Sequence, residues 1–102
     1  MKGLRQGDII KIQGYKDRFL LVSKNAFISA TGMFHVCPFL PDVPSGPLHI
    51  AATGKNGENG TAVCESLKLI DPSVRSCRRL DSLAYRDIIN ISDAIQGIFE
   101  YD

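Results

Sequence analysis

GDIIKIQGYKDRFLLVS, residues 7–23, contains two short apolar runs separated by a polar stretch. The first run, Ile9–Ile12, alternates loosely after a Gly-Asp pair, which predicts a strand that begins near Asp8. The second run, Phe19–Ser23, is continuous and too short for a helix, which predicts a strand buried on both faces. We therefore expect two strands joined by a turn around Gly14.

The polar stretch between these strands contains two basic residues, Lys16 and Arg18, on either side of Asp17. Polar residues of this kind are common in solvated turns. Arginine is also the side chain whose planar fork of donors matches phosphate oxygens and stays charged at any physiological pH. The residues alone leave two interpretations open: a solvated turn, or an arginine placed to bind an anion such as a phosphate.

The following segments alternate between turn signals and short apolar runs. Residues Lys24–Gly32 are small and polar and end in Thr-Gly, which predicts a hairpin or loop. Met33–Phe39 predicts a third strand, ended by proline. Leu40–Pro47 contains three prolines and one glycine and predicts an irregular loop, after which Leu48–Ala52 predicts a fourth strand.

Residues Thr53–Thr61 contain three glycines and two asparagines, which is typical of an exposed hairpin tip. A functional loop is the alternative interpretation of this segment. Thr61–Cys64 and Leu67–Ile70 predict one or two further strands, and the following Asp-Pro pair ends the run.

Near the C-terminus, apolar side chains recur at spacings of three and four, at Ala84, Ile88, Ile91, Ile95 and Ile98. This spacing predicts one face of a helix over residues 82–99, capped by Asp81 or Ser82. Strands first and one helix last indicate an α+β, mainly β fold. We expect a small antiparallel SH3-like barrel with a C-terminal amphipathic helix closing one side.

The composition indicates one globular domain over residues 1–102. The chain is 44% hydrophobic and 23% charged, and its net charge of +1 does not demand a nucleic-acid partner, although a local basic patch is compatible with it. Its three cysteines, Cys37, Cys64 and Cys77, have spacings that suit neither a disulfide framework nor a zinc site. The sequence shows no signal-peptide core and no membrane span, so we expect a cytoplasmic protein that needs no metal or other cofactor.

No stand-alone catalytic motif is present, so single side chains are the candidates for chemistry. His35 lies in an apolar strand, where a hydrogen-bonded structural histidine is the simpler interpretation. His49 follows the proline-rich loop and is either structural or part of a cleft beside that loop. RSCRR, residues 75–79, is the only basic cluster. It forms either a solvated connection before the helix or the rim of a phosphate site.

The order of these segments resembles the MazF/PemK family of bacterial toxins. The similarity covers nearly the whole chain: RQGDIIKI (residues 5–12), DRFLLVS (17–23), TGMFHVCPF (31–39), CESLKLID (64–71) and the final amphipathic helix preceded by arginines. The resemblance implies a CcdB/PemK-type barrel. It also implies that the chain is the toxin component of a type II toxin–antitoxin system.

Members of this family typically cleave single-stranded RNA, often messenger RNA, without a metal, using the 2′-hydroxyl of the substrate as nucleophile. The chemistry needs a proton acceptor, a cation for the charge on the phosphorane, and a donor for the leaving 5′-oxygen. Arg18 falls at the position of the central arginine of the family, which favours phosphate binding. Glu65 aligns with the family's acid, where it is expected to act as the base or to orient Arg18.

The implied site departs from the family at the catalytic Thr or Ser, whose position is Leu40 here. Leucine neither donates nor accepts a hydrogen bond. Ser45 and His49 are the candidate replacements. The connection between the first two strands, which gates the site in the family, is also much shorter here. The residues expected to contact RNA are Lys16, Arg75, Arg78 and Arg79.

The resemblance implies a homodimer and an antitoxin partner with an acidic, initially disordered segment. That segment is expected to bind beside Arg18 and residues 75–79. The alternative function is a non-catalytic protein on the same fold: a gyrase poison like CcdB, or an inactive relative that binds only RNA or antitoxin. The fold does not choose between them. Leu40 favours the alternative, whereas Arg18, Glu65 and the arginine cluster favour the endoribonuclease.

Overall fold

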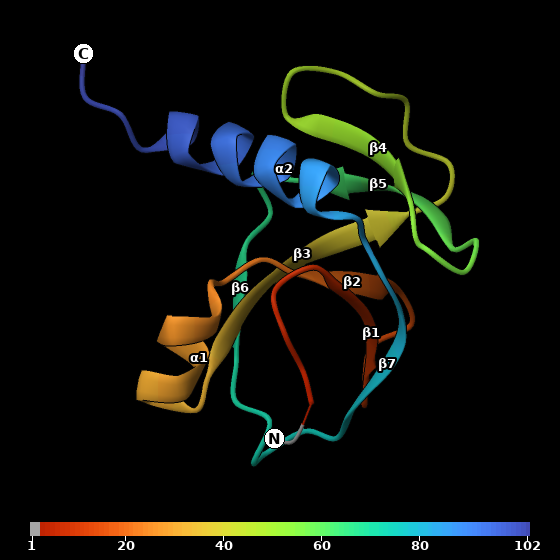
Figure 1. Ribbon diagram of the computed structural model, residues 1–102, viewed down its shortest axis with the longest axis vertical. Helices are drawn as coiled ribbons and strands as arrows, with labels where there is room; N and C mark the ends of the chain where they lie inside the picture. Colours follow the sequence, from red (N-terminus) through yellow and green to blue (C-terminus); the bar gives the residue numbers. More distant parts are fainter. Residues whose placement is uncertain (1–2) are drawn as a thin grey trace.

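The computed structural model describes residues 3–102, which form seven strands and two helices (Figure 1). In chain order they are β1 (Asp8–Ile12), β2 (Arg18–Leu21), α1 (Asn25–Thr31), β3 (Phe34–Leu40), β4 (His49–Thr53), β5 (Asn59–Val63), β6 (Lys68–Ile70), β7 (Cys77–Ser82) and α2 (Tyr85–Ile98). The paired strands are antiparallel. The predicted α+β, mainly β class with a C-terminal helix is therefore confirmed.

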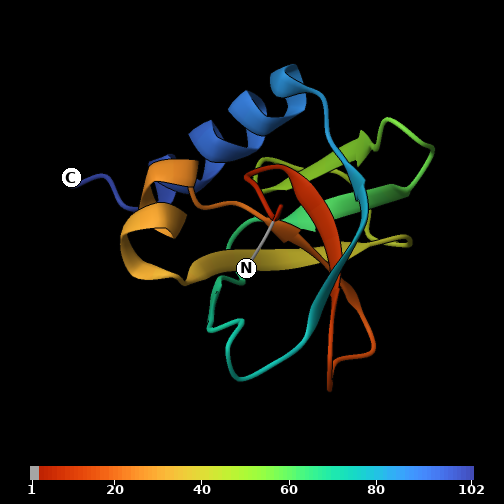
Figure 2. The ribbon, with the colours of Figure 1, turned by 60° about the horizontal axis from the view of Figure 1, so that its bottom comes forward.

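The sheet has the strand order β4-β5-β3-β2-β1-β7, and β6 pairs with β3 (Figures 1 and 2). Strand β3 is long enough to pair with β6 near Phe34 and with β5 near Leu40. The sheet curls until the β4–β5 hairpin reaches the end of β7, where the N–H of Lys55 donates to the carbonyl of Ser82 at 2.9 Å. Within residues 3–102, β4 and β7 do not pair, so the predicted barrel is not closed.

Alternating side chains of the central strands divide the core into two clusters. In β2, Phe19 and Leu21 pack into one cluster, and Leu20 packs into the other. All three side chains are buried. The prediction that this strand is buried on both faces is confirmed, and its apolar run follows from having core on both sides.

Helix α2 covers the second cluster with much of the predicted apolar face. Ile91 is buried there, and Ile88 and Ile95 pack beside it. Gly7 lies beneath the helix, and a Cβ at this residue would overlap the side chain of Ile88. The glycine therefore lets α2 approach the sheet closely. Neither helix within residues 3–102 has the length and apolar character needed to cross a membrane.

The first difference from the sequence prediction is helix α1, which lies in the segment predicted as a hairpin or loop. The helix is short and contains no buried residue, so it leaves no apolar period in the sequence. Gly32 ends it in the left-handed region, with φ 72°, and donates its N–H to the carbonyl of Ile28 at 2.8 Å. The Thr-Gly pair is therefore a helix end rather than a hairpin turn.

The second difference is strand β7, which the sequence prediction missed. Residues expected to form a connection and the start of the helix instead pair with β1, with Lys11 opposite Arg78. Helix α2 consequently begins at Tyr85, later than predicted. Asp81 and Ser82, the expected caps, lie in β7, and no side chain among residues 3–102 caps the N-terminus of α2.

Candidate functional site

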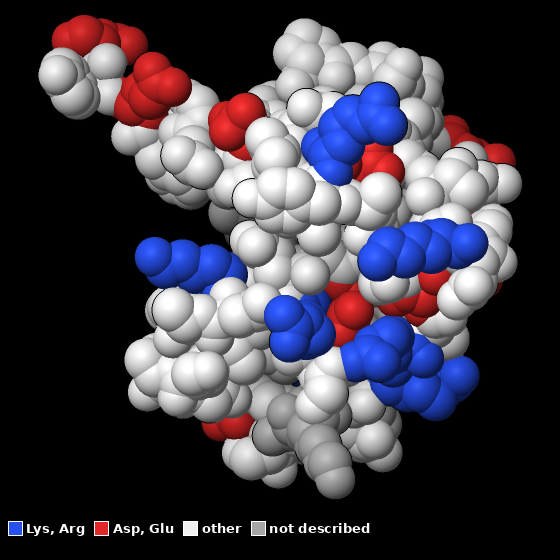
Figure 3. All heavy atoms as spheres, viewed as in Figure 1, with Lys and Arg blue, Asp and Glu red and all other residues white. Residues whose placement is uncertain are grey.

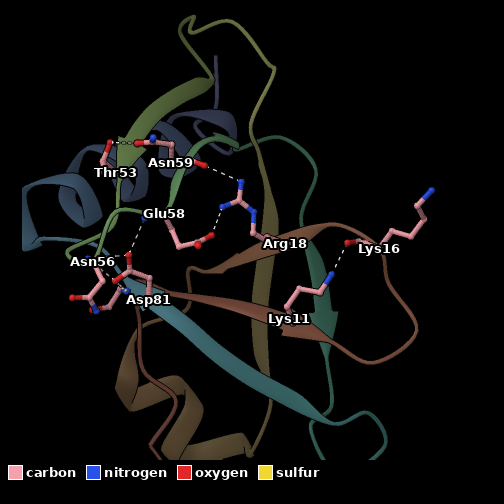
Figure 4. A network of polar contacts seen from close by, with 9 residues as sticks. Lys11, Lys16, Arg18, Thr53, Asn56, Glu58, Asn59 and Asp81 are labelled. Carbon is pink, nitrogen blue, oxygen red and sulfur yellow. Dashed lines mark hydrogen bonds and ion pairs between the residues drawn. The ribbon is translucent and has the colours of Figure 1, made fainter.

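Arg18 begins β2, and its guanidinium extends to the β4–β5 hairpin (Figure 4). Nη1 donates to Oε1 of Glu58 at 2.5 Å, and Nη2 donates to the carbonyl of Asn59 at 2.8 Å. The guanidinium carbon lies 5.4 Å from the centre of the Phe39 ring. Only 19% of the Arg18 side chain is exposed. A charged fork held by three groups is oriented in advance, so Arg18 is not the free side chain of a solvated turn.

Glu58, the ion-pair partner of Arg18, comes from the hairpin tip that the sequence predicts as a simple turn. The predicted hairpin is confirmed, because β4 and β5 pair on either side of residues 54–58. Sequence reasoning missed Glu58, because an acidic residue among glycines and asparagines is common in any solvated turn. Its only signal was a single carboxylate in a turn segment whose other charged residue is Lys55.

Asp81 at the end of β7 holds the hairpin tip in place (Figure 4). Its carboxylate is 2% exposed and accepts the N–H groups of Asn56 at 3.0 Å, Glu58 at 3.1 Å and Ser82 at 2.8 Å. A Cβ at Gly54 would collide with this carboxylate, so the glycine is required for the close approach. Burial raises the pKa of Asp81, but the hydrogen bonds outweigh burial and leave the pKa below its usual value.

A hydroxyl and an amide complete the network around Arg18. Thr53 Oγ1 donates to Oδ1 of Asn59 at 2.7 Å, while the backbone carbonyl of Asn59 accepts from Arg18. Arg18 and Glu58 are therefore linked to both strands of the hairpin. Sequence reasoning also missed Thr53 and Asn59, because strand pairing, not local spacing, brings them together.

The sequence-predicted acid, Glu65, belongs to a different pair. His49 Nε2 lies 3.0 Å from Glu65 Oε2, and both side chains are well exposed. The hydrogen bond with His49 holds the pKa of Glu65 below its usual value. Glu65 thus orients His49, and the expectation that it orients Arg18 is wrong, because Glu58 makes that ion pair.

The structure places the candidate catalytic residues at two ends of the hairpin. Arg18 contacts Asn59 at the start of β5, whereas His49 lies opposite Val63 at its end. Four residues of extended strand separate these two positions by about 13 Å. Ser45 is exposed in the proline-rich loop beside Gly46, which forms a β-bridge with His49, and therefore lies on the His49 side.

Leu40, which the sequence resemblance places at the position of the family's catalytic hydroxyl, ends β3 and is half-buried. The residue opposite it in β5 is Thr61. The Thr61 side chain is buried and donates to the carbonyl of Val43 at 2.8 Å, which ties the proline-rich loop to the sheet. Thr61 therefore serves the loop and does not replace the missing hydroxyl.

His35, interpreted as a structural histidine, is half-buried on β3. Its Nδ1 lies 3.0 Å from Ser23 Oγ, and its backbone N–H donates to the same oxygen at 2.6 Å. The Phe27 ring of α1 lies 5.2 Å from the imidazole, between ring centres. These contacts support the structural interpretation.

The predicted arginine rim does not form one patch. Arg78 lies opposite Lys11, whereas Arg79 lies opposite Ile10 and donates through Nε to Oδ2 of Asp8 at 3.0 Å. Neighbouring residues of a strand point to opposite faces, which separates these two arginines. Arg79 and Arg5 both line a groove of about 450 Å³. Figure 3 shows that the basic side chains are spread over this face of the molecule, and that acidic side chains lie at the projecting C-terminal end.

The remaining predicted RNA contacts lie around the β1–β2 turn. Arg75 donates to the carbonyl of Gln13 at 3.0 Å, and its guanidinium carbon lies 5.0 Å from the centre of the Tyr15 ring. Lys16 is exposed, and its carbonyl accepts the Nζ of Lys11 at 2.5 Å. Lys16 therefore lies close to Lys11 and Arg18, whereas Arg75 braces the other side of the turn.

The cysteines and acidic residues show no metal-site geometry. Across residues 3–102, no three His, Cys, Asp or Glu side chains form a group that could hold a metal ion. Cys37, Cys64 and Cys77 are free thiols, and the first two are buried. Burial raises the pKa of all three thiols.

Comparison with protein-family models and with curated protein sequences found no match. Solved structures match the fold over nearly the whole chain. A MazE–MazF complex (form II) from Deinococcus radiodurans has 15% identity, 97% of both chains covered and a TM-score of 0.81. An endoribonuclease bound to its cognate antitoxin, from a mycobacterial species, has 16% identity, coverage of 98% of this chain and 99% of that one, and a TM-score of 0.77. The Mycobacterium tuberculosis toxin MazF-mt6 has 16% identity, 96% and 99% coverage and a TM-score of 0.69. The chain therefore has the fold of the MazF toxins.

Proposed function

We propose that this chain is the toxin component of a toxin–antitoxin pair and that it cleaves single-stranded RNA in the cytoplasm. The observation that carries the proposal is the Arg18–Glu58 pair, with 2.5 Å between Nη1 and Oε1, on the fold of the MazF toxins. The solved neighbours include an endoribonuclease in complex with its cognate antitoxin, which supports both the activity and the kind of partner.

In the proposed reaction, the 2′-hydroxyl of the RNA attacks the adjacent phosphorus while the bond from phosphorus to the 5′-oxygen breaks. The Glu58 carboxylate takes the hydroxyl proton, and the Arg18 guanidinium stabilises the charge that develops on the phosphate oxygens. Water protonates the departing 5′-oxygen, because Leu40 carries no donor. The products are a 2′,3′-cyclic phosphate and a 5′-hydroxyl. Arg18 supplies the positive charge, so the proposed reaction is metal-independent.

The test compares two carboxylates that differ in their contacts. Purified protein is incubated with a long single-stranded RNA in the presence of EDTA, and the new ends are identified. We expect cleavage with 5′-hydroxyl ends. Glu58→Gln should lower the cleavage rate by about 10²-fold or more, because it removes both the base and the ion-pair partner of Arg18. Glu65→Gln should cost much less, because Glu65 contacts His49 instead of Arg18. A greater loss of cleavage rate in Glu65→Gln than in Glu58→Gln would show that Glu65, the acid indicated by the sequence, is the base.

A second candidate function is a toxin or binding protein without catalysis. Leu40 at the position of the family's hydroxyl favours it, and so does Glu58, which already neutralises Arg18 in the free protein. Expression of the chain without a partner separates the two. Growth arrest with shortened messenger RNA supports the endoribonuclease, growth arrest with DNA breaks supports a gyrase poison, and absence of both supports a pure binding protein.

The proposed protein partner is an antitoxin that binds through an acidic, initially disordered segment. Folding upon binding allows such a segment to cover a large surface, and its carboxylates would take the place of RNA phosphates beside Arg18. Because Arg75, Arg78 and Arg79 do not form one patch, we expect the antitoxin segment to bind only on the side of the protein where Arg18 and Arg78 lie.

A further inference from the structure

We propose that Arg18, Lys11 and Arg78 form a binding track for successive phosphates of one single-stranded RNA. These three residues are named the cationic row below. The inference rests on the proposed function and extends it, because it adds Lys11 and assigns a path for the RNA backbone away from Arg18 across β1 to β7.

The strand register carries this inference. Lys11 in β1 lies opposite Arg18 in β2 on one side and opposite Arg78 in β7 on the other. Residues directly opposite each other in antiparallel strands place their side chains on the same face of the sheet. Strands lie about 4.8 Å apart, so the row spans about 10 Å in a line perpendicular to the strands.

The cationic row is unfavourable in the free protein. Like charges directly opposite each other destabilise a sheet, and Lys11 and Arg78 form such a pair, whereas the charge of Arg18 is already neutralised by Glu58. Within residues 3–102, Glu58 is the only carboxylate that forms an ion pair with the row, and it contacts only the Arg18 end. An anionic ligand would relieve the repulsion between Lys11 and Arg78.

The row also retains hydrogen-bonding capacity for a ligand. Arg18 has five N–H donors, of which two are used, by Glu58 and by the carbonyl of Asn59. The Nζ of Lys11 has three donors, of which one contacts the carbonyl of Lys16. Arg78 is exposed. Figure 4 shows Arg18 beside Glu58 and Asn59 of the hairpin, and Lys11 and Lys16 near one another on the side of the β1–β2 turn.

A nucleic-acid strand fits this arrangement better than a single anion does. One phosphate can contact one end of the row, but charges in a line over three strands match a chain of phosphates. The row begins at Arg18, where the proposed function places the phosphate that is cleaved. The neighbouring phosphates of the same strand then lie over Lys11 and Arg78.

The experiment measures binding of a fluorescein-labelled, mixed-sequence 2′-O-methyl RNA as a function of KCl concentration. This probe lacks the nucleophile of the proposed reaction, so binding is separated from cleavage. Each phosphate contact on a single strand contributes about 0.7 to the slope of log K against log salt. We expect Lys11→Gln and Arg78→Gln each to flatten the slope by about that amount, and the double variant to flatten it by about twice as much.

Lys24→Gln and Arg86→Gln are matched controls, because both cations are exposed and lie outside the row, Lys24 just before α1 and Arg86 in α2. They should leave the slope unchanged. Lys11→Arg and Arg78→Lys keep the charge and should keep the slope, which separates loss of charge from loss of fold. Because the row is repulsive, the two glutamine variants should melt no lower than the controls in circular dichroism.

Three results would overturn the inference: a parent protein that does not bind the probe, row variants whose slopes equal those of the controls, or row variants that lose affinity only for a poly-glutamate peptide. The last result would assign the row to an acidic protein partner. Cleavage of ordinary RNA by the parent with unaffected slopes would reject the row and keep the proposed function. A row that binds the probe in a protein that cuts no RNA would reject the nuclease and keep the row.

Discussion

At the scale of single residues, the central feature is a charged group whose position is settled before any ligand arrives. Arg18 is held by the Glu58 carboxylate and by the carbonyl of Asn59, and it lies over the Phe39 ring. A guanidinium fixed in this way needs little reorganisation when charge develops on a phosphate, which is the condition for strong electrostatic stabilisation of a transition state.

Replacement of Arg18 by alanine should abolish cleavage while the protein remains folded. One positioned donor is typically worth about 2.7–4 kcal/mol in the transition state, or about 10²–10³ in rate. Arg18→Lys should not restore full activity, because a point charge cannot reproduce the fork. Single-turnover RNA cleavage measures the rate, and circular dichroism checks the fold. A folded Arg18→Ala protein that still cuts RNA would exclude Arg18 as the catalytic cation. Growth arrest by that variant without RNA cleavage would support the non-catalytic candidate.

The three thiols should be poorly reactive in the native protein. Burial raises the pKa of Cys37 and of Cys64, and the same effect acts on the half-buried Cys77. The thiolate is the reactive form, so a raised pKa and limited access both slow alkylation. Mass spectrometry after iodoacetamide should find Cys37 and Cys64 unmodified at neutral pH, whereas unfolding in urea should expose all three. Rapid native labelling of Cys37 would show that the core opens.

At the scale of elements, the β4–β5 hairpin supplies Glu58, and β7 decides where that hairpin lies. The connection is the Asp81 carboxylate, which accepts backbone N–H groups from the hairpin tip. Gly54 and Asp81 lie so close that no side chain fits between them. The hairpin tip is therefore a braced element, although its composition is that of a free turn.

Removal of the Asp81 carboxylate should loosen the hairpin and lower activity through Arg18. Asp81→Ala leaves the part-buried N–H groups of Asn56 and Glu58 without their acceptor, at a cost of at most about 1–3 kcal/mol each. We expect a lower midpoint in urea unfolding, faster hydrogen exchange in residues 54–58, and a reduced kcat. Exchange as slow as in the parent would show that strand pairing alone holds the tip.

The same carboxylate should make stability depend on pH in the acidic range. The folded-state pKa of Asp81 lies below its usual value of about 3.9, so its contribution is complete above that value and is lost as the pH falls through the lower folded pKa. The free energy of unfolding of the parent should therefore fall below about pH 4. Asp81→Asn should show a smaller fall than the parent in the same series of urea titrations. Equal falls would assign the acid sensitivity to other carboxylates.

Close packing between hairpin and strand gives a second prediction at this scale. Gly54→Ala would place a methyl group against the Asp81 carboxylate and should disrupt the tip. Gly57→Ala is a useful comparison, because a Cβ there meets no other atom and only its positive φ is strained. Thermal unfolding should show the larger loss for Gly54→Ala. The reverse order would mean that backbone strain, and not the approach of Asp81, dominates in this turn.

At the scale of the whole molecule, α2 and the C-terminal residues present apolar surface to solvent. Tyr85, Ile89, Ile98, Phe99 and Tyr101 are large apolar side chains that remain exposed. The C-terminal end of α2 projects from the sheet (Figure 1). Exposed large apolar side chains favour association, and two-fold pairing is the commonest form that association takes.

We therefore predict a homodimer at micromolar concentration. Sedimentation velocity should report about twice the mass of one chain, and Phe99→Asp should shift the equilibrium towards monomer by placing a charge in the apolar surface. Arg86→Gln, also on α2 but outside this apolar set, is the matched control. A parent protein that sediments only as monomer would contradict the prediction.

Much of the fold follows from local patterns. The apolar runs that became β1, β2 and β3 are short and bounded by turn residues, and the spacing of Ile88, Ile91 and Ile95 predicts the face of α2 that packs on the sheet. Helix α1 was not predicted, because none of its residues is buried and its sequence therefore has no helical spacing of apolar residues. Strand β7 escaped because its arginines resemble a solvated connection.

The sequence by itself determined the class of fold, the order of most strands along the chain and the hairpin, because each of these rests on neighbouring residues. Only the tertiary structure decided what Arg18 contacts. Its partner Glu58 lies 40 residues away and is placed by Asp81, which lies 23 residues further along the chain. Such contacts leave no local period or spacing in the sequence, because they exist only after the curled sheet brings the hairpin tip against the end of β7.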